Sequence, residues 1–274
     1  MRSSDRTIKI LVLITLVLLT ILYATPIYVV LVTSLKTGVE VSQRQYLVPT
    51  ASPQLQNYVD AFRLIWPSLV NSTIIAGSVT LISALTGGLG GYYLSRTRST
   101  LTKVLFILVG IAIYLPYQAV LIPLVQLMAG TGLALTHWGL ILSYLILNLP
   151  LATVLMGTFF LGIPRELEEV AEVDGASRIQ IFFRVITPIS MPAYASTAII
   201  IFTQVWNEFL LALTLATPAT TTIQPKLAEI KGSFVAVYHI QMAAAVITLI
   251  VPLVIFLALG HYFVKGILAG ALKG

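Results

Sequence analysis

The sequence predicts an all-α membrane protein with six transmembrane helices. Of its 274 residues, 58% are apolar and only 9% are charged, whereas soluble domains carry roughly 25% charged residues. The 16 Lys and Arg and the 10 Asp and Glu are too few to cover the surface of a water-soluble core of this size. Much of the surface must therefore face membrane lipid.

Six apolar runs are long enough to cross a bilayer, because a spanning helix needs about 20 residues and a barrel strand only about 10. The runs are residues 8–35, 72–94, 103–128, 138–161, 193–215 and 242–264. The first run resembles a signal peptide, but it exceeds the usual apolar core of about 7 to 15 residues and no A-x-A site follows it. We therefore expect it to stay as the first span of a single transmembrane domain, residues 1–274.

The distribution of basic residues predicts the orientation. With the N-terminus inside, 11 of the 16 Lys and Arg lie on the cytoplasmic side: Arg2, Arg6, Lys9, Arg96, Arg98, Lys103, Arg165, Arg178, Arg184, Lys265 and Lys273. The other five lie outside: Lys36, Arg44, Arg63, Lys226 and Lys231. By the positive-inside rule, both termini are expected in the cytoplasm. The protein itself is expected in the inner membrane of the cell. The basic residues lie in short groups between apolar runs, so no nucleic-acid partner is expected.

Residues 162–191 are the most informative connection, and the expected orientation places them in the cytoplasm. They hold five of the ten acidic residues within nine positions: Glu166, Glu168, Glu169, Glu172 and Asp174. Pro164 suits the first position of a helix, and Gly175 can end that helix in a left-handed conformation. Leu167, Val170 and Ala171 share one face of it at helical spacing.

A second short helix is predicted in the same segment, because Ile179, Phe182, Phe183 and Ile186 recur at helical spacing. Pro188 and Pro192 are expected to end it before the fifth run. Two short amphipathic helices with exposed aromatic rings could lie on the bilayer surface. Such helices are usually basic, since the inner leaflet is anionic, and this segment has five acids against three arginines. Docking into a groove of a protein partner fits better.

The acidic segment resembles the EAA loop of ABC importer permeases. The matching residues are Glu169, Val170, Ala171, Asp174, Gly175, Ala176 and Pro188. The resemblance implies that residues 162–191 form the coupling helix, which docks on an ATP-binding subunit. The residues expected to couple are Glu169, Ala171, Asp174, Gly175, Ala176, Phe182 and Phe183. Val170, Val185 and Thr187 depart from the family pattern by small changes.

Short strings extend the resemblance toward the maltose-type carbohydrate permeases, specifically the shorter partner of the permease pair. They are TSLK at 33–36, NY at 57–58, NS at 71–72, WNE at 206–208 and AGALKG at 269–274. The resemblance implies a type I ABC importer permease fold with a cytoplasmic coupling-helix loop. It also implies four kinds of partner: a second homologous permease in a heterodimer, two ATP-binding subunits, an extracytoplasmic solute-binding protein and a sugar substrate.

Residues for catalysis are missing from the sequence. A P-loop needs a lysine directly after a glycine, and no lysine here follows one. There is no cysteine for a thiol nucleophile or a disulfide, and no G-x-S-x-G element. His137, His239 and His261 are far apart and form no H-E-x-x-H metal motif. We therefore expect no enzyme activity, no metal and no cofactor in this chain, with ATP and Mg²⁺ held by the partner ATPase.

Polar residues within the fifth run are candidates for a substrate pathway. Thr203, Gln204, Asn207 and Glu208 are predicted to share one side of a helix. Amides and a carboxylate suit a hydroxylated solute, and Trp206 adds a flat apolar face. Interhelical hydrogen bonding is the alternative role for these residues. Asn148 and Gln118 lie near prolines and are weaker candidates, since they could instead satisfy carbonyls that the prolines free.

Two other functions stay open at this point. An ABC importer permease for polyamine, phosphate or glycerol phosphate would share the acidic loop. A secondary transporter or channel would explain six spans and Glu208, but it leaves the acidic amphipathic segment without a role.

Overall fold

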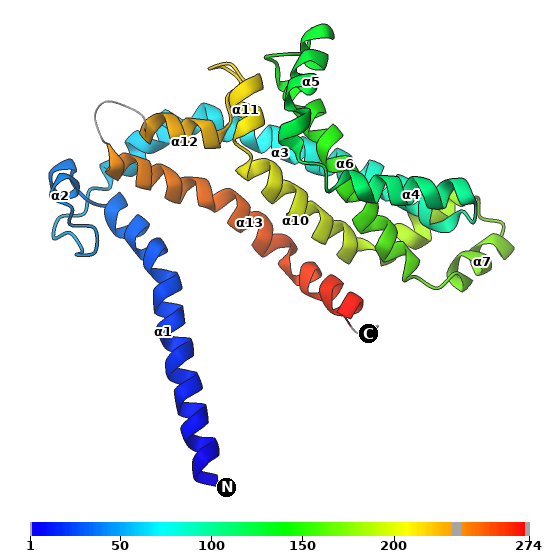
Figure 1. The fold of residues 1–274 in the computed structure, drawn as a ribbon, viewed down its shortest axis with the longest axis horizontal. Helices are drawn as coiled ribbons and strands as arrows, with labels where there is room; N and C mark the ends of the chain where they lie inside the picture. Colours follow the sequence, from blue (N-terminus) through cyan, green and yellow to red (C-terminus); the bar gives the residue numbers. More distant parts are fainter. Residues whose placement is uncertain (1, 232–236, 272–274) are drawn as a thin grey trace. The chain divides into compact units, whose positions relative to one another are not determined.

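A computed structural model shows helices joined by loops and no strand among the residues it describes, which confirms the predicted fold class (Figure 1). It describes residues 2–231 and 237–271, with side chains for 8–230 and 237–262. Leu272, Lys273 and Gly274 of the family-like ending lie outside the described residues. The chain divides into two compact units, Met1–Trp66 with Lys226–Ile250 and Pro67–Pro225 with Val251–Gly274.

The helices follow the order of the chain. The first unit holds α1 (Arg2–Ser34) and α2 (Gly38–Ser42). Three helices belong partly to each unit: α3 (Gln56–Arg96), α12 (Ile223–Lys231) and α13 (Tyr238–Ala271). The second unit holds α4 (Thr100–Ala112), α5 (Tyr117–Gly130), α6 (His137–Leu161), α7 (Glu166–Val173), α8 (Arg178–Ile181), a π-helical turn (Phe182–Ile186), α9 (Thr187–Ile189), α10 (Met191–Asn207) and α11 (Leu210–Leu215).

The end of α1 is fixed by hydrogen bonds within the first unit. The Asn57 side-chain amide donates to the carbonyls of Ser34 at 2.9 Å and Lys36 at 2.8 Å. The hydroxyls of Ser34 and Tyr58 lie 2.6 Å apart. Lys36 is buried and its ammonium donates to the Gln45 carbonyl. The strings TSLK and NY therefore tie α1 to the start of α3.

A second set of hydrogen bonds holds the Thr-rich segment 216–222 in the second unit. The Asn71 amide donates to the carbonyls of Ala219 at 3.0 Å and Thr221 at 3.1 Å. Its oxygen lies 2.9 Å from His137 Nε2, and the Ser72 hydroxyl accepts from the Ile223 N–H at 2.7 Å. Asn71 and Ser72 thus anchor that segment, and His137 has a packing role.

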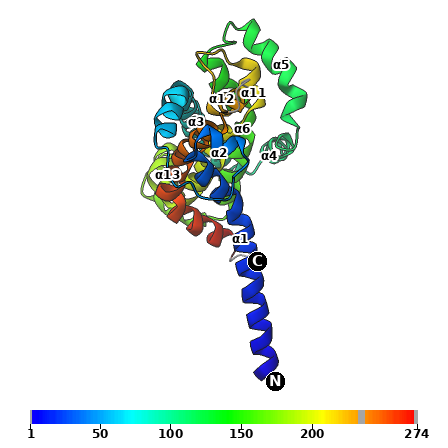
Figure 2. The same cartoon turned by 90° about the vertical axis from the view of Figure 1, so that its left-hand side faces the viewer.

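Four described helices are long and apolar enough to cross a membrane, and six spans result when each of two bent helix pairs counts as one. The third predicted run is one of these pairs: α4 and α5 meet at an angle of 100° (Figure 2). Pro116 explains the break, because it lacks an N–H and disfavours helical geometry at the residue before it. The third run is therefore a bent pair of helices that counts as one of the six candidate spans.

The fifth predicted run is also interrupted. α10 ends at Asn207, and Glu208 has extended backbone angles, with φ −72° and ψ 135°. Residues 210–215 form the separate helix α11. Glu208 therefore does not share a helical face with Thr203, Gln204 and Asn207 as predicted. It lies at a helix break, where backbone N–H groups need acceptors.

Glycines allow α3 and α6 to approach closely in the second unit. A Cβ added at Gly91 would lie 2.6 Å from the Gly157 nitrogen and 2.7 Å from the Thr153 carbonyl oxygen. A Cβ added at Gly87 would likewise meet Ala152 of α6. The glycines at 87 and 91 therefore have the close-packing role expected of small residues between membrane helices.

Gly91→Ala should destabilise the protein, because its methyl group meets backbone of α6 that cannot move aside without separating the helices. Overpacking of this kind costs about 1 to 3 kcal/mol. Gly77→Ala on the same helix is the matched control, since nothing lies within 4 Å of the added Cβ. Thermal unfolding of the purified chain in detergent measures both, and equal midpoints would contradict the close approach.

Candidate functional site

The acidic hairpin, residues 164–192, joins two short helical pieces at Gly175. Gly175 has a φ of +82°, which confirms the left-handed conformation predicted for it. The Ala176 N–H donates to the Ala171 carbonyl at 3.0 Å, so the last carbonyls of α7 are satisfied at this turn. Pro164 precedes the first turn of α7 and does not occupy its first position.

The second piece of the hairpin ends between Pro188 and Pro192, before the fifth run, as predicted. α8, the π-helical turn and α9 run through Pro188 to Ile189. The chain bends by 76° at Ser190 before α10. The Ser190 hydroxyl donates to the Ile186 carbonyl at 2.7 Å, and Pro192 lies in the first turn of α10, where a missing N–H is tolerated.

The two aromatic side chains of the hairpin have different surroundings. Phe183 is 53% exposed, whereas Phe182 is only 4% exposed. Phe182 belongs to a core cluster that also contains Met156, Phe160, Ile163, Ile181, Ile186 and Ala193. The prediction that both rings face a partner is therefore wrong for Phe182, because helical spacing alone does not show which ring the core takes.

The other residues predicted to couple are divided between surface and core. Glu169, Asp174 and Gly175 are exposed. Ala171 and Ala176 are half-buried and pack against the core cluster. The exposed surface also carries apolar side chains, which are Val170, Val173 and Ile179. A surface with apolar and acidic side chains side by side is typical of a protein contact.

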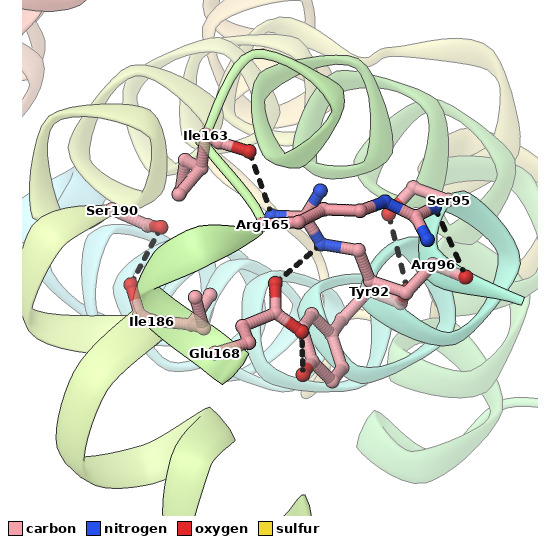
Figure 3. Close-up of polar contacts among 8 residues, drawn as sticks. All are labelled: Tyr92, Ser95, Arg96, Ile163, Arg165, Glu168, Ile186 and Ser190. Carbon is pink, nitrogen blue, oxygen red and sulfur yellow. Dashed lines mark hydrogen bonds and ion pairs between the residues drawn. The ribbon is translucent and has the colours of Figure 1, made fainter. Parts of the chain in front are cut away.

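The first helix of the hairpin is fastened to the end of α3 by a clasp that consists of Tyr92, Arg96 and Glu168 (Figure 3). Arg96 Nε lies 2.6 Å from Glu168 Oε1, and the two side chains are 11% and 15% exposed. The Tyr92 hydroxyl donates to Glu168 Oε2 at 2.7 Å. The Arg96 guanidinium also donates to the Ile163 carbonyl at 3.0 Å, and Arg165 donates to the Arg96 carbonyl at 3.2 Å.

A cavity of about 590 Å³ lies beside the clasp. Clasp residues line it together with Arg98, Glu169, Glu172, Arg178 and Phe183. Sequence reasoning missed Tyr92 and Arg96. Their i, i+4 spacing at the end of a predicted span was the available signal.

Glu208 lies at the break between α10 and α11 and contacts α5 at its first residue, directly after the bend between α4 and α5. Its carboxylate accepts from the hydroxyls of Tyr144 at 2.7 Å and Tyr117 at 3.3 Å. It also accepts from the backbone N–H groups of Leu211 at 2.9 Å and Ala212 at 3.2 Å. These N–H groups open α11 and have no partner within that helix. The carboxylate and its four donors are called the Glu208 hub below.

A cavity of about 680 Å³ lies beside the Glu208 hub. Its polar lining residues are Tyr117, Tyr144, Asn148, Gln204 and Glu208, and its other lining residues are apolar. The predicted pathway residues Asn148, Gln204 and Glu208 therefore come together. Tyr117 and Tyr144 were missed, although Tyr144 lies one helical turn before Asn148.

Trp206 and Asn207, which were predicted to belong to the same pathway, do not line this cavity. Trp206 is 3% exposed and stacks on Phe202 with ring centroids 5.4 Å apart. Asn207 donates to the Thr203 carbonyl at 2.9 Å and accepts from Gln224 at 3.3 Å. Two residues along a helix turn a side chain by about 200°, so Trp206 faces away from the side of α10 that carries Gln204.

Within the described part of the chain, no three His, Asp or Glu side chains gather as a metal site would require. The polar groups of the two cavities can instead form hydrogen bonds with a ligand or a partner.

Solved structures share this fold. A chain from the crystal structure of a bacterial ABC transporter involved in the import of the acidic polysaccharide alginate matches with a TM-score of 0.79 and 21% identity, over 95% of this chain and 97% of that one. A chain of the MetNI methionine ABC transporter matches with a TM-score of 0.56 and 18% identity, over 77% of this chain and 95% of that one. The chain thus has the fold of ABC importer permeases.

Curated relatives agree over most of the sequence. The glucose import system permease protein GlcU of Saccharolobus solfataricus is 34% identical, over 93% of this chain and 91% of its own. The melibiose/raffinose/stachyose import permease protein MelC of Bacillus subtilis is 31% identical over 91% of each chain. The alpha-glucoside transport system permease protein AglG of Rhizobium meliloti is 37% identical, over 85% of this chain and 64% of its own.

The family described as the inner membrane component of binding-protein-dependent transport systems matches residues 85–268, which include the acidic hairpin and the Glu208 hub. This agrees with the resemblance of the acidic residues to the EAA loop. The chain therefore belongs to the binding-protein-dependent transport system inner membrane components, the permeases of ABC importers.

Proposed function

We propose that this chain is the permease subunit of an ATP-driven importer that carries a carbohydrate across the inner membrane. The cavity beside the Glu208 hub is the observation that carries the proposal, because its apolar walls and its amide and hydroxyl groups suit a sugar. The names of GlcU, MelC and AglG, which refer to glucose, melibiose-type and alpha-glucoside import, support the same substrate class.

Sugars present hydroxyls around an apolar ring, and the cavity offers partners for both. Gln204 is exposed to the cavity and forms no side-chain hydrogen bond with another described residue, so its amide can both donate and accept. The Asn148 amide donates to the Tyr144 carbonyl at 2.8 Å, which leaves its oxygen as an acceptor. Gln204 is therefore the residue that we expect to contact substrate first.

The charge of the cavity argues against other solutes of the same transporter class. Among the residues that the structure describes, no Lys, Arg or His lines the cavity, so a phosphate or glycerol phosphate would lack a counter-ion there. Glu208 has both carboxylate oxygens engaged by the four donors of the hub. A polyamine would have to displace these donors to pair with it. A neutral solute fits better.

The acidic hairpin is proposed as the coupling loop that docks on the ATPase. The full importer would contain a second homologous permease, two ATP-binding subunits that hold ATP and Mg²⁺, and an extracytoplasmic binding protein. Val170, Val173, Ile179 and Phe183 supply the exposed apolar contact, and Glu169 and Asp174 supply charge. Phe182 supports the hairpin from within.

Both termini and the acidic hairpin are proposed to lie in the cytoplasm, because 11 of the 16 basic residues then lie inside. The natural chain has no cysteine, so a single Glu172→Cys variant can be labelled in isolation. An impermeant thiol reagent should reach it only after the cells are opened, and labelling of intact cells would contradict the orientation.

Gln204→Leu should lower sugar uptake roughly tenfold, since a hydroxyl left without its partner costs about 1 to 3 kcal/mol. Uptake of labelled mono- and oligosaccharides is measured in proteoliposomes that contain the assembled importer, ATP and the binding protein. Co-purification of the ATPase should be unchanged.

Gln118→Leu is the matched control, because the same substitution on α5 lies outside the lining of the cavity. Its uptake should equal that of the unmodified chain. Normal uptake by Gln204→Leu, or loss of assembly in that variant, would contradict the substrate role. Uptake that needs neither ATP nor the binding protein would contradict the proposed function itself.

Gly175→Val should weaken ATPase binding and uptake, because a left-handed backbone costs a residue with a side chain roughly 1 to 2 kcal/mol. No atom lies within 4 Å of a Cβ added at Gly175, so backbone conformation alone decides the effect. Gly175→Asn is the control, since asparagine adopts positive φ more readily. Co-purification with the ATPase measures both variants, and equal retention would show that the turn does not shape the docking surface.

A further inference from the structure

We propose that the clasp of Tyr92, Arg96 and Glu168 transmits the movement of the acidic hairpin to α3, so that Arg96 and Glu168 are positioning residues for transport. The inference rests on the proposed function, because a docked ATPase is taken to move the hairpin. It adds a residue-level connection from the hairpin to a span that is not its neighbour in the chain.

The chain itself connects the hairpin only to α6 and α10. Glu168 and Arg96 are separated in sequence by all of α4, α5 and α6, so the attachment to α3 depends on side chains. Figure 3 shows Arg96 between the turn at Ile163 and the first helix of the hairpin. The Arg96 guanidinium thus connects the end of α3, to which it belongs, with α7 and with the turn that follows α6.

Several contacts make the attachment stiff. Tyr92 and Arg96 lie one helical turn apart on the same face of α3, and both bind the one carboxylate of Glu168, at 2.7 Å and 2.6 Å. Two points of contact oppose rotation of α7 about either of them. The low exposure of Arg96 and Glu168 also limits competition by water, so separating the charges is unfavourable.

Aromatic packing supports the same attachment. The Tyr92 ring lies 5.1 Å from the ring of the buried Phe182 and 5.8 Å from that of Phe160, between centroids. Phe182 comes from the second piece of the hairpin and Phe160 from α6. Both pieces of the hairpin are therefore packed on the last turns of α3.

The remaining acids of the hairpin differ from Glu168. Glu169 and Glu172 are exposed, and neither has a Lys, Arg or His nitrogen of the described side chains within 4 Å. Glu168 is thus the acid of the hairpin that faces the protein interior. Glu172 provides a matched control on the same helix.

A continuous set of contacts leads from the clasp to the substrate cavity. α3 packs on α6 through Gly87 and Gly91, and α6 carries Tyr144 and Asn148, which line the cavity. Movement of the hairpin is passed by the clasp to α3 and by the glycine contact to α6. Such a chain of packed elements is the physical basis that coupling between distant sites requires.

The test compares Glu168→Arg, Arg96→Glu and the exchange of both charges in the reconstituted importer. The quantity measured is the number of ATP molecules hydrolysed per sugar transported, with ATPase co-purification measured in parallel. Each single variant should raise this ratio roughly tenfold while the ATPase stays bound. The double exchange should restore the ratio to within about twofold of the unmodified value, because the ion pair is re-formed. Glu172→Arg should leave it unchanged.

An unchanged ratio in the single variants would overturn the proposal, and so would a double exchange that rescues nothing or a Glu172→Arg variant that uncouples equally. If Glu168→Arg does not assemble, Glu168→Gln is measured in its place. Loss of assembly in Glu168→Gln as well would assign the clasp to folding alone and overturn its role in coupling. Normal sugar uptake by the unmodified importer with no effect of the clasp variants refutes only this inference. No ATP-dependent sugar uptake by the unmodified importer refutes the proposed function and the inference together.

Discussion

The carboxylate of Glu208 is the contact on which the arrangement around the neighbouring cavity depends. A break in a membrane helix exposes backbone N–H and C=O groups that lipid cannot satisfy. Glu208 accepts the N–H groups of Leu211 and Ala212 at one break and the hydroxyl of Tyr117 directly after the other. The hydroxyl of the buried Tyr144 completes the set. A charge that is costly in hydrocarbon is thereby fixed, and the same contacts form one side of the cavity.

The acidic hairpin and the cavity are two ends of one packed structure within the second unit. The hairpin is fixed to α3 through Glu168, α3 lies against α6 at Gly91, and α6 carries Tyr144 to the Glu208 hub. Charged and hydroxyl groups thus form the contacts at the hairpin and at the Glu208 hub. Small residues allow α3 and α6 to approach closely between them. This division is physically reasonable, because close helix contact in lipid depends on small residues and on polar groups that satisfy one another.

Length and composition predicted the helices well, because the thickness of the bilayer fixes how long an apolar run must be. The fourth run was predicted at 138–161 and α6 is His137–Leu161. The break at Glu208 was not predictable in this way, since it depends on Tyr117 and Tyr144, which are remote in sequence. Pro116 was a local signal for the other break. Periodicity also could not distinguish the buried Phe182 from the exposed Phe183, because both suit the same helix.

A double-mutant cycle between Tyr144→Phe and Glu208→Gln tests the central claim most directly. The free energy of unfolding of the purified chain is measured in mixed detergent for the unmodified chain, both single variants and the double variant. Groups that share a hydrogen-bond network usually show interaction energies of about 0.5 to 3 kcal/mol. The double variant should be destabilised by about 1 kcal/mol less than the sum of the single variants. Effects that add to within about 0.3 kcal/mol would contradict a stabilising Glu208 hub that includes Tyr144.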